Sequence, residues 1–222
     1  MLSDEEIRED VIDELTWDPA VDARRIGVAV KDGVVTLTGT VDTYSEKLQA
    51  ERAAERVHGV AAVANDIEVK LPGSLQRTDA DIAEAAVNAL KWNTMVPSDK
   101  VKVVVENGWV TLRGEVDWHY QRESAREAVE HLTGVRGVSN LITVKPRVRP
   151  EDIKRRLDQA LKRSAELDAR NIQVTATDGK VILTGTVRSW AERNDAEAAA
   201  WSAPGVTEVE NRIRVDYSAL AA

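Results

Sequence analysis

The chain has 222 residues and no cysteine, and its 38 acidic and 30 basic side chains give a formal net charge of -8. The lack of cysteine excludes disulfides, zinc-thiolate sites and cysteine nucleophiles. The acidic balance argues against nucleic-acid binding, because proteins that bind phosphates use clusters of Lys and Arg to release counterions.

The N-terminus, from Met1 to Ile7, carries acids where a secretory signal peptide carries positive charge and then an apolar run. No later segment is apolar over the length that a bilayer span needs. We therefore expect a cytoplasmic protein. Most of the excess acid lies in residues 1–70, which hold 16 acids and 8 bases.

One short pattern occurs three times. Each copy begins with an Asp-Gly or Asn-Gly pair and continues as an alternating apolar stretch that contains a second glycine. The pairs are Asp32-Gly33, Asn107-Gly108 and Asp178-Gly179. Such a pair is the strongest short signal of a β-hairpin, and a glycine inside a strand indicates that another backbone comes close.

The three copies align without a gap over residues 7–70, 82–145 and 153–216. Self-similarity at this period is typical of tandem modules. The repeat predicts three modules joined by short linkers that contain proline and glycine. We place the modules at residues 1–70, 78–145 and 150–217.

Local patterns within the first copy predict its elements. An apolar stripe of Ile7, Val11 and Leu15 predicts a helix, and two strands follow on either side of the first Asp-Gly pair. Thr43 and Glu46 predict a capping box at the start of a second helix. The buried face of that helix is mostly alanine, and residues 63–69 predict a third strand.

Each module therefore reads α-β-β-α-β. The fold class is α+β: three tandem modules, each a small three-stranded mixed sheet with two helices on one face. Gly59 is expected to cap the second helix, and Gly39 is expected to let that helix lie close to the sheet. A module of about 65 residues has a marginal core, so we expect the modules to pack on one another.

A family resemblance rests on two motifs. One is the Asp/Asn-Gly-x-Val-x-Leu-x-Gly-x-Val strand, and the other is Gly-Val-x-x-Val-x-Asn, at residues 59–65, 134–140 and 205–211. Together they resemble the BON domain of bacterial osmotic-stress and nodulation proteins. The resemblance implies a non-enzymatic module linked to osmotic and envelope stress and proposed to bind phospholipid or membrane surfaces. Some cytoplasmic members are associated with potassium binding.

The residues themselves give no support to an enzyme or a cofactor. The three histidines, His58, His119 and His131, never occupy aligned positions, and neither a His-Glu-x-x-His motif nor a phosphate-binding glycine loop occurs. His58 and His131 suit solvated helix ends. The Asp-Gly turns lack the further acids of a calcium loop. A potassium ion held by backbone carbonyls stays open, because side-chain motifs do not reveal such a site.

Aromatic residues cluster just before the second helix. Tyr44, His119 and Trp190 occupy aligned positions, and the middle copy extends the cluster to Trp118 and Tyr120. Trp118 stands where the other copies have a capping Thr or Ser, which helix capping does not explain. Tyr and Trp are common at membrane interfaces and at protein contacts, so these residues are candidates for lipid or partner contact or for packing between modules.

Two further features complete the candidates. Trp17 and Trp92, aligned at the ends of the first helices, are expected to pack in the core or at its flank. Basic residues gather between the second and third modules and could meet anionic headgroups or simply be solvated. The ones that we name as candidates are Arg147, Arg149, Arg155 and Arg156.

The sequence leaves three functions open. The first is a non-enzymatic protein that binds anionic phospholipid or a membrane surface under stress. The second is a cytosolic protein that binds potassium or responds to cations, and the third is a scaffold for a protein partner. Nucleic acid is not an expected partner.

Overall fold

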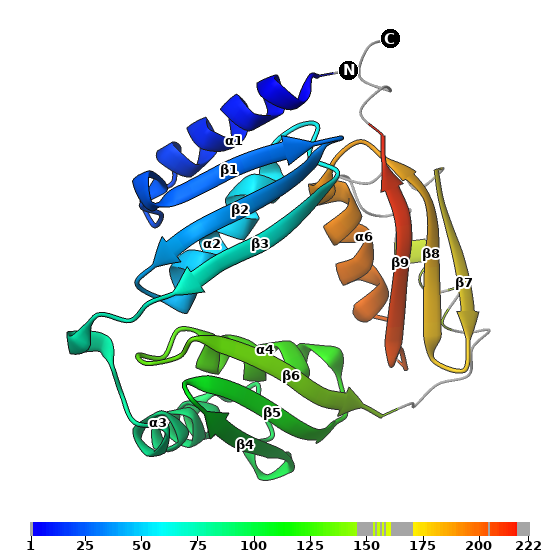
Figure 1. The fold of residues 1–222 in the computed structure, drawn as a ribbon. Coiled ribbons are helices and arrows are strands. Elements are labelled where there is room, and N and C mark those ends of the chain that lie inside the picture. Colours follow the sequence, from blue (N-terminus) through cyan, green and yellow to red (C-terminus); the bar gives the residue numbers. More distant parts are fainter. Residues whose placement is uncertain are drawn as a thin grey trace. The chain divides into compact units, whose positions relative to one another are not determined.

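The computed structural model describes residues 2–145, 153, 155, 157, 159–160, 171–203 and 205–216. The elements of the first module are α1 (Asp4–Trp17), β1 (Ile26–Lys31), β2 (Val34–Val41), α2 (Tyr44–Arg56) and β3 (Ala62–Val69) (Figure 1). β1 pairs antiparallel with β2, and β2 pairs parallel with β3. The predicted α-β-β-α-β order and mixed three-stranded sheet are confirmed.

The other modules repeat this plan. The second contains α3 (Asp79–Trp92), β4 (Val101–Glu106), β5 (Trp109–Val116), α4 (His119–Glu130) and β6 (Gly137–Val144). The third contains β7 (Ile172–Thr177), β8 (Lys180–Val187), α6 (Trp190–Trp201) and β9 (Glu208–Val215). In both sheets the middle strand is the second of the three. The predicted first helix of the third module lies largely outside the described residues, among which Ile153 and Leu157 are helical and buried.

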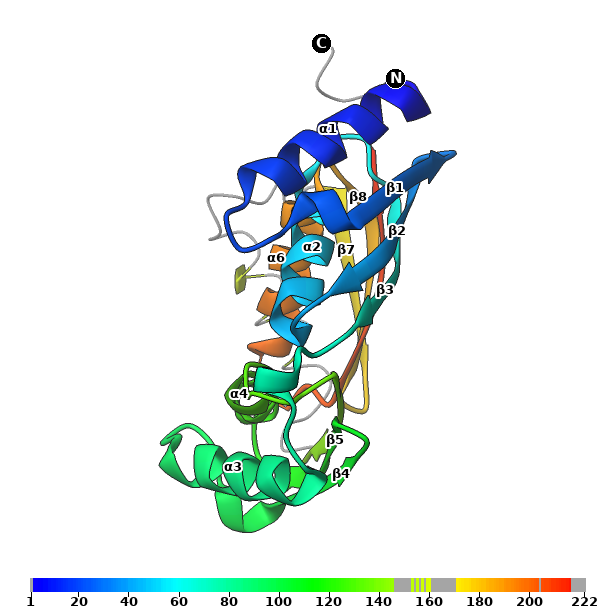
Figure 2. The same cartoon turned by 60° about the vertical axis from the view of Figure 1, so that its left-hand side comes forward.

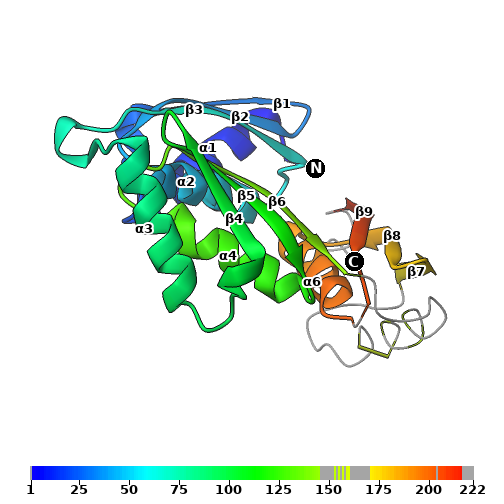
Figure 3. The ribbon, with the colours of Figure 1, turned by 90° about the horizontal axis from the view of Figure 1, so that it is seen from below.

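Helices α1 and α2 lie on the same side of the β1–β3 sheet, as two further views show (Figure 2) (Figure 3). The core between these layers contains the predicted α1 stripe and the alanine face of α2. Its buried members include Ile7, Val11, Leu15, Val35, Leu37, Ala50, Ala53 and Ala54. Burying one of the Val, Leu or Ile side chains contributes about 1.5–3 kcal/mol, so a core this small depends on nearly all of them.

The glycine inside β2 is required by a different close contact from the predicted contact with the second helix. A Cβ on Gly39 would clash with the backbone carbonyl of Arg25, just before β1, and the residue has φ +126. The close approach is therefore between neighbouring strands, and the α2 helix is not its cause. Gly114 and Gly185 meet the same obstacle in the other two modules.

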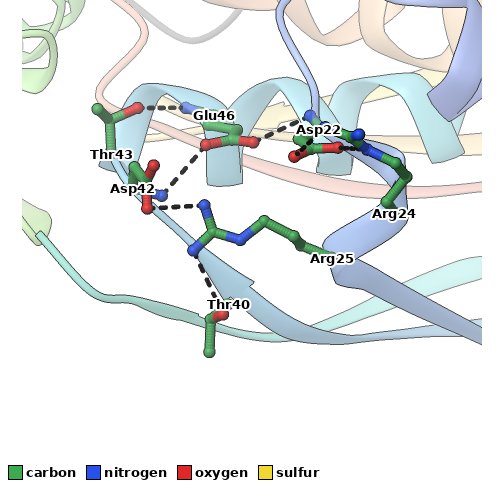
Figure 4. A network of polar contacts seen from close by, with 7 residues as sticks. All are labelled: Asp22, Arg24, Arg25, Thr40, Asp42, Thr43 and Glu46. Atoms are coloured by element: carbon green, nitrogen blue, oxygen red, sulfur yellow. Dashed lines mark hydrogen bonds and ion pairs between the residues drawn. The ribbon is translucent and has the colours of Figure 1, made fainter. Parts of the chain in front are cut away.

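The start of α2 shows half of the predicted capping box. The Thr43 hydroxyl accepts a hydrogen bond from the Glu46 backbone N–H (3.1 Å). The Glu46 carboxylate instead accepts from the N–H groups of Asp42 (3.2 Å) and Asp22 (3.0 Å) (Figure 4). Glu46 thus ties the segment before β1 to the helix start. Beside it, the Arg25 guanidinium pairs with the Asp42 carboxylate at 2.7 Å.

The hairpin turn is held by an acid of α1 that the sequence did not single out. Asp4 accepts hydrogen bonds from the N–H groups of Asp32 (2.9 Å) and Gly33 (3.0 Å). In the second module, Asp79 does the same for the Asn107-Gly108 turn, at 2.8 and 2.9 Å. These carboxylates therefore have a structural role besides their favourable position at a helix N-terminus.

The asparagine of the second motif joins the last strand to the second helix. The Asn65 amide donates to the Lys47 carbonyl (3.2 Å) and the Glu51 carboxylate (2.8 Å), and its oxygen accepts from the Ile67 N–H (3.3 Å). Asn140 and Asn211 make the corresponding bonds to a helix carbonyl. The motif that carries the family resemblance is thus explained by folding, since it satisfies polar groups between strand and helix.

The described residues fall into two compact units. One lies within residues 1–89, 103–111 and 127–139, and the other within 90–102, 112–126 and 140–222. None of the helices in the described part of the chain combines the length and the apolar composition that a bilayer crossing requires.

Candidate functional site

Trp17 and Trp92 project into solvent, which corrects the prediction that they pack in or beside the core. Their exposed fractions are 83% and 88%. Each is the last residue of its helix and comes two positions after the last buried leucine, Leu15 or Leu90. Two residues turn a helix by about 200°, so these side chains face away from the core. The first and second modules therefore each present an exposed indole at the end of the first helix, and we call these two places the α1 tip and the α3 tip.

The α1 tip is acidic. Trp17 lines an open cavity of about 450 Å³ whose other lining residues are Asp10, Asp13, Glu14, Arg56, Val57 and His58. Arg56 is engaged by Glu14 at 2.9 Å and by Asp18 at 3.3 Å. Its single charge thus faces two carboxylates, while Asp10 and Asp13 lie exposed beside the indole. This surface repels anions.

The α3 tip lacks those acids. The residues aligned with Asp10, Asp13 and Glu14 are Ala85, Asn88 and Ala89. Instead, Lys91 precedes Trp92, and Met95 follows in the next turn. Both Lys91 and Met95 are exposed, Met95 by 51%.

The turn after α3 fixes the position of Met95. The Asn93 side chain accepts from the Met95 N–H (2.9 Å), and the Asn93 carbonyl accepts from the Val96 N–H (3.1 Å). Val96 is buried, so it anchors the turn from below. Met95 and Trp92 are therefore presented outward by a constrained turn. Trp92 and Met95 are thus two large apolar side chains, three residues apart, that are both exposed to solvent.

The aromatic residues that were predicted as one cluster have different surroundings in the structure. His119, the first residue of α4, stacks on Trp201, the last residue of α6, with ring centroids 3.9 Å apart and planes at 9°. The Arg122 guanidinium lies 5.8 Å from the same indole. Burial lowers the pKa of His119, and Arg122 adds to this effect, whereas Glu123 and Glu197 act in the opposite direction.

The other aromatic candidates differ in their surroundings. Trp190 lies under the guanidinium of Arg193, 4.8 Å from its ring centre. Tyr44 is partly buried at the start of α2. Trp118 and Tyr120 are exposed to solvent over part of their surface and remain available for contact.

The side chain of Gln121 binds the backbone just before α4. Its side-chain oxygen accepts hydrogen bonds from the N–H groups of Asp117 (3.0 Å) and Trp118 (3.1 Å). The aligned Glu46 and Glu192 bind N–H groups before their helices in the same way. The Gln121 N–H, whose counterparts donate to the Thr43 and Ser189 hydroxyls, donates in α4 to the Trp118 carbonyl (3.1 Å). A backbone carbonyl thus takes the place of the missing hydroxyl.

A chain of polar residues links α2 to the end of α4. Ser45 Oγ lies 2.8 Å from His131 Nδ1, and His131 Nε2 lies 3.5 Å from a carboxylate oxygen of Glu130, which is 2% exposed. The order of groups resembles a hydrolytic triad, but the adjoining cavity has only about 70 Å³, and sites for small molecules need several hundred. Arg52 approaches Glu130 at 3.9 Å. The arrangement fits a contact between α2 and α4 better than a catalytic site.

The basic candidates are only partly visible. Arg147, Arg149 and Arg156 lie outside the described residues. Arg155 is an exposed helical residue. Within the described part of the chain, three or more His, Asp or Glu side chains never converge as a metal site would require.

Comparisons with known proteins agree with the repeat. The family model of the BON domain matches residues 3–70, 78–146 and 151–217. The osmotically-inducible protein Y of Escherichia coli (strain K12) is 32% identical over 124 residues, which cover 54% of this chain and 62% of that protein. The match thus spans less than two thirds of the length of this relative.

Among solved structures, the C-terminal domain of CdsD, the structural protein of the type III secretion system of Chlamydia trachomatis, aligns with a TM-score of 0.27 and 14% identity. The alignment covers 97% of this chain and all of that one, 100%. A second CdsD structure gives a TM-score of 0.26 at 14% identity, with 97% and 96% covered. The threefold family match covers nearly the whole chain, and the protein therefore belongs to the BON domain family, with three BON domains in tandem.

Proposed function

We propose that this protein is a non-enzymatic, stress-associated binding protein that attaches reversibly to anionic phospholipid surfaces through its α3 tip. The observation that carries the proposal is the pair of exposed apolar side chains at that tip, Trp92 at 88% and Met95 at 51%. The osmotically-inducible relative supports the association with stress. The α1 tip, with the same indole but several acids, is not expected to bind such a surface.

The chemistry of the tip suits the boundary between water and acyl chains. Tryptophan is enriched there because its ring is apolar while its N–H keeps a hydrogen-bond partner. A methionine is flexible enough to fill irregular space between lipids. Lys91 adds attraction of about 1 kcal/mol to an anionic leaflet.

The size of the tip sets the expected strength. Burial of one Trp and one Met contributes about 1.5–3 kcal/mol each, comparable to a weak single anchor. We therefore expect reversible binding that needs a high density of anionic lipid and weakens as salt screens the headgroups. Trp118, Tyr120 and Arg155, with the other basic candidates, are proposed as auxiliary contacts.

The test is flotation of the full chain with vesicles of phosphatidylglycerol or of phosphatidylcholine. We expect binding to the anionic vesicles alone, lost in Trp92→Ala/Met95→Ser and kept in Trp17→Ala. Both exposed sites tolerate such changes, so circular dichroism should be unchanged in all variants. Equal loss in the Trp17 and Trp92 variants, or binding that ignores lipid charge, would refute the assignment to the α3 tip.

Potassium binding remains the alternative proposal, supported by the family resemblance and by the excess acid of the first module. An ion that binds the native state raises the melting temperature by mass action. Thermal unfolding in matched potassium and sodium chloride separates this effect from general screening. A rise specific to potassium would favour this alternative; identical curves would remove its support, and a protein scaffold would then be the remaining rival to lipid binding.

A further inference from the structure

The contact between α4 and α6 contains a histidine in an unusual setting. The His119 ring is 16% exposed and lies flat on the Trp201 indole. Its Nδ1 is buried, and so is Nε of Arg122; among the described residues, neither atom has a hydrogen-bond partner. A buried polar atom without a partner costs free energy, so such a site calls for an explanation.

The charges around the imidazole come from both helices. On α4, Glu123 lies 3.9 Å from His119 Nε2, which is too long for a hydrogen bond, and Arg122 presents its guanidinium to the same indole. On α6, Glu197 contributes a weaker electrostatic attraction. The two acids favour an imidazolium, whereas burial and Arg122 oppose it. Burial is the largest of these effects, and the pKa of His119 is accordingly lowered.

Protonation would change this contact at two points. With the hydrogen of the neutral ring assigned to Nε2, which faces the Glu123 carboxylate, protonation adds a hydrogen to Nδ1. This creates a second buried donor without an acceptor, beside Arg122 Nε, which already lacks one. It would also place two cations against one indole. The attraction of a cation to an indole face does not offset the cost of a buried donor that has no acceptor.

We propose that the stack of His119 on Trp201 is a proton-operated latch. It holds α4 against α6 while the imidazole is neutral, and it releases them when the imidazole takes up a proton. The other modules have Tyr44 and Trp190 at the aligned position, and neither side chain ionises near neutral pH. Release uncovers Trp201 and His119 next to the partly exposed Trp118 and Tyr120.

The latch can be tested by the distance between two spin labels. The chain has no cysteine, so Lys102→Cys and Gln173→Cys introduce the only two labelling positions, both exposed. We expect a narrow distance distribution at pH 7.5 and a longer, broader one at pH 5.0. An unchanged distribution at pH 5.0 would overturn the proposal.

Two histidine variants separate the latch from general effects of acid. His119→Tyr keeps an aromatic ring that does not ionise near these pH values. The distribution of label distances in this variant should therefore stay narrow at both pH 7.5 and pH 5.0. His131→Gln removes a histidine outside this contact. Its label distances should lengthen at pH 5.0 as they do in the parent chain. Opening that persists in His119→Tyr would overturn the proposal.

A second measurement serves if His119→Tyr fails to fold. Nuclear magnetic resonance of the parent chain, with isotope-labelled histidine, follows the ring titration of His119 directly. Its midpoint should lie below the ordinary histidine value of about 6.5 and coincide with the opening measured by the labels. A ring that titrates without any change in the label distance would contradict a latch.

Discussion

The α1 tip and the α3 tip differ in charge although they share a fold position and an exposed tryptophan. Trp17 stands among Asp10, Asp13 and Glu14, and Trp92 stands after Ala85, Asn88 and Ala89 with Met95 beside it. The indole is thus a shared means of contact, and the helix face next to it determines which ligands approach. Repetition of a module does not imply repetition of its function.

The largest expected effect comes from giving the α3 tip the acids of the α1 tip. The triple variant Ala85→Asp/Asn88→Asp/Ala89→Glu adds three negative charges one or two helical turns before Trp92. At about 1 kcal/mol per charge near an anionic surface, the loss is roughly a hundredfold in vesicle affinity. Flotation measures it; the control is Ala85→Asn/Ala89→Gln, which adds polarity without charge. Equal vesicle affinity of the charged and neutral variants would show that charge does not distinguish the α3 tip from the α1 tip.

The reverse exchange should turn the α1 tip into a second contact. Asp10→Ala/Asp13→Asn/Glu14→Ala leaves Arg56 paired with Asp18 and removes the repulsion around Trp17. A second weak contact on one chain raises overall affinity by effective concentration, which we expect to reach about tenfold. In this triple variant Trp17→Ala should lower the affinity for anionic vesicles, whereas in the parent chain it should leave that affinity unchanged. If Trp17→Ala changes vesicle affinity in neither chain, the acids beside Trp17 do not cause the difference in binding between the two tips.

Where the two modules are alike, the same substitution should have the same effect. Asp4→Ala and Asp79→Ala each remove two hydrogen bonds to a hairpin turn. We expect a cost of about 1–2 kcal/mol in each case, measured as a lower urea midpoint. Asp10→Ala, an exposed acid on α1, is the control and should stay within about 0.5 kcal/mol. A cost in one module alone would show that their hairpins are held differently.

The smallest effect concerns pH. The pKa of His119 is lowered in the folded chain, so between its folded pKa and the ordinary value of about 6.5 the unfolded chain binds more protons. Stability from this contact is therefore complete above that ordinary value and falls as the pH drops below it. Thermal unfolding of the parent should show this decline, and His119→Tyr should lessen it. A parent whose stability rises on mild acidification relative to that variant would contradict the sign.

The fold was predictable because local and repeated signals agreed. The Asp-Gly and Asn-Gly pairs predicted the hairpin turns. The spacing of Ile7, Val11 and Leu15 predicted the buried face of the first helix. The exposure of Trp17 was also within reach of the sequence. Counting two positions from Leu15 places it opposite the core, but its bulk and apolar character favoured the wrong interpretation.

Other features needed coordinates. Asp4 lies 28 residues before the turn whose first N–H it binds, and local patterns carry no signal for a bond of that span. The contact of His119 with Trp201 joins residues of two modules, which aligning the copies cannot pair. The role of Gln121 at the start of α4 depends on a side chain that reaches back, and its neighbour Trp118 had suggested a helix without a cap.

The most direct test of the account follows all six tryptophans at once. Fluorotryptophan incorporated into the full chain gives one fluorine resonance per residue, assigned through single Trp→Phe variants. Anionic vesicles with a spin-labelled lipid then broaden the resonances of residues that enter the membrane interface. We predict strong broadening of Trp92 and none of Trp17. Broadening of Trp17 to the same degree, or a Trp92 resonance that stays sharp on bound protein, would contradict attachment through the α3 tip.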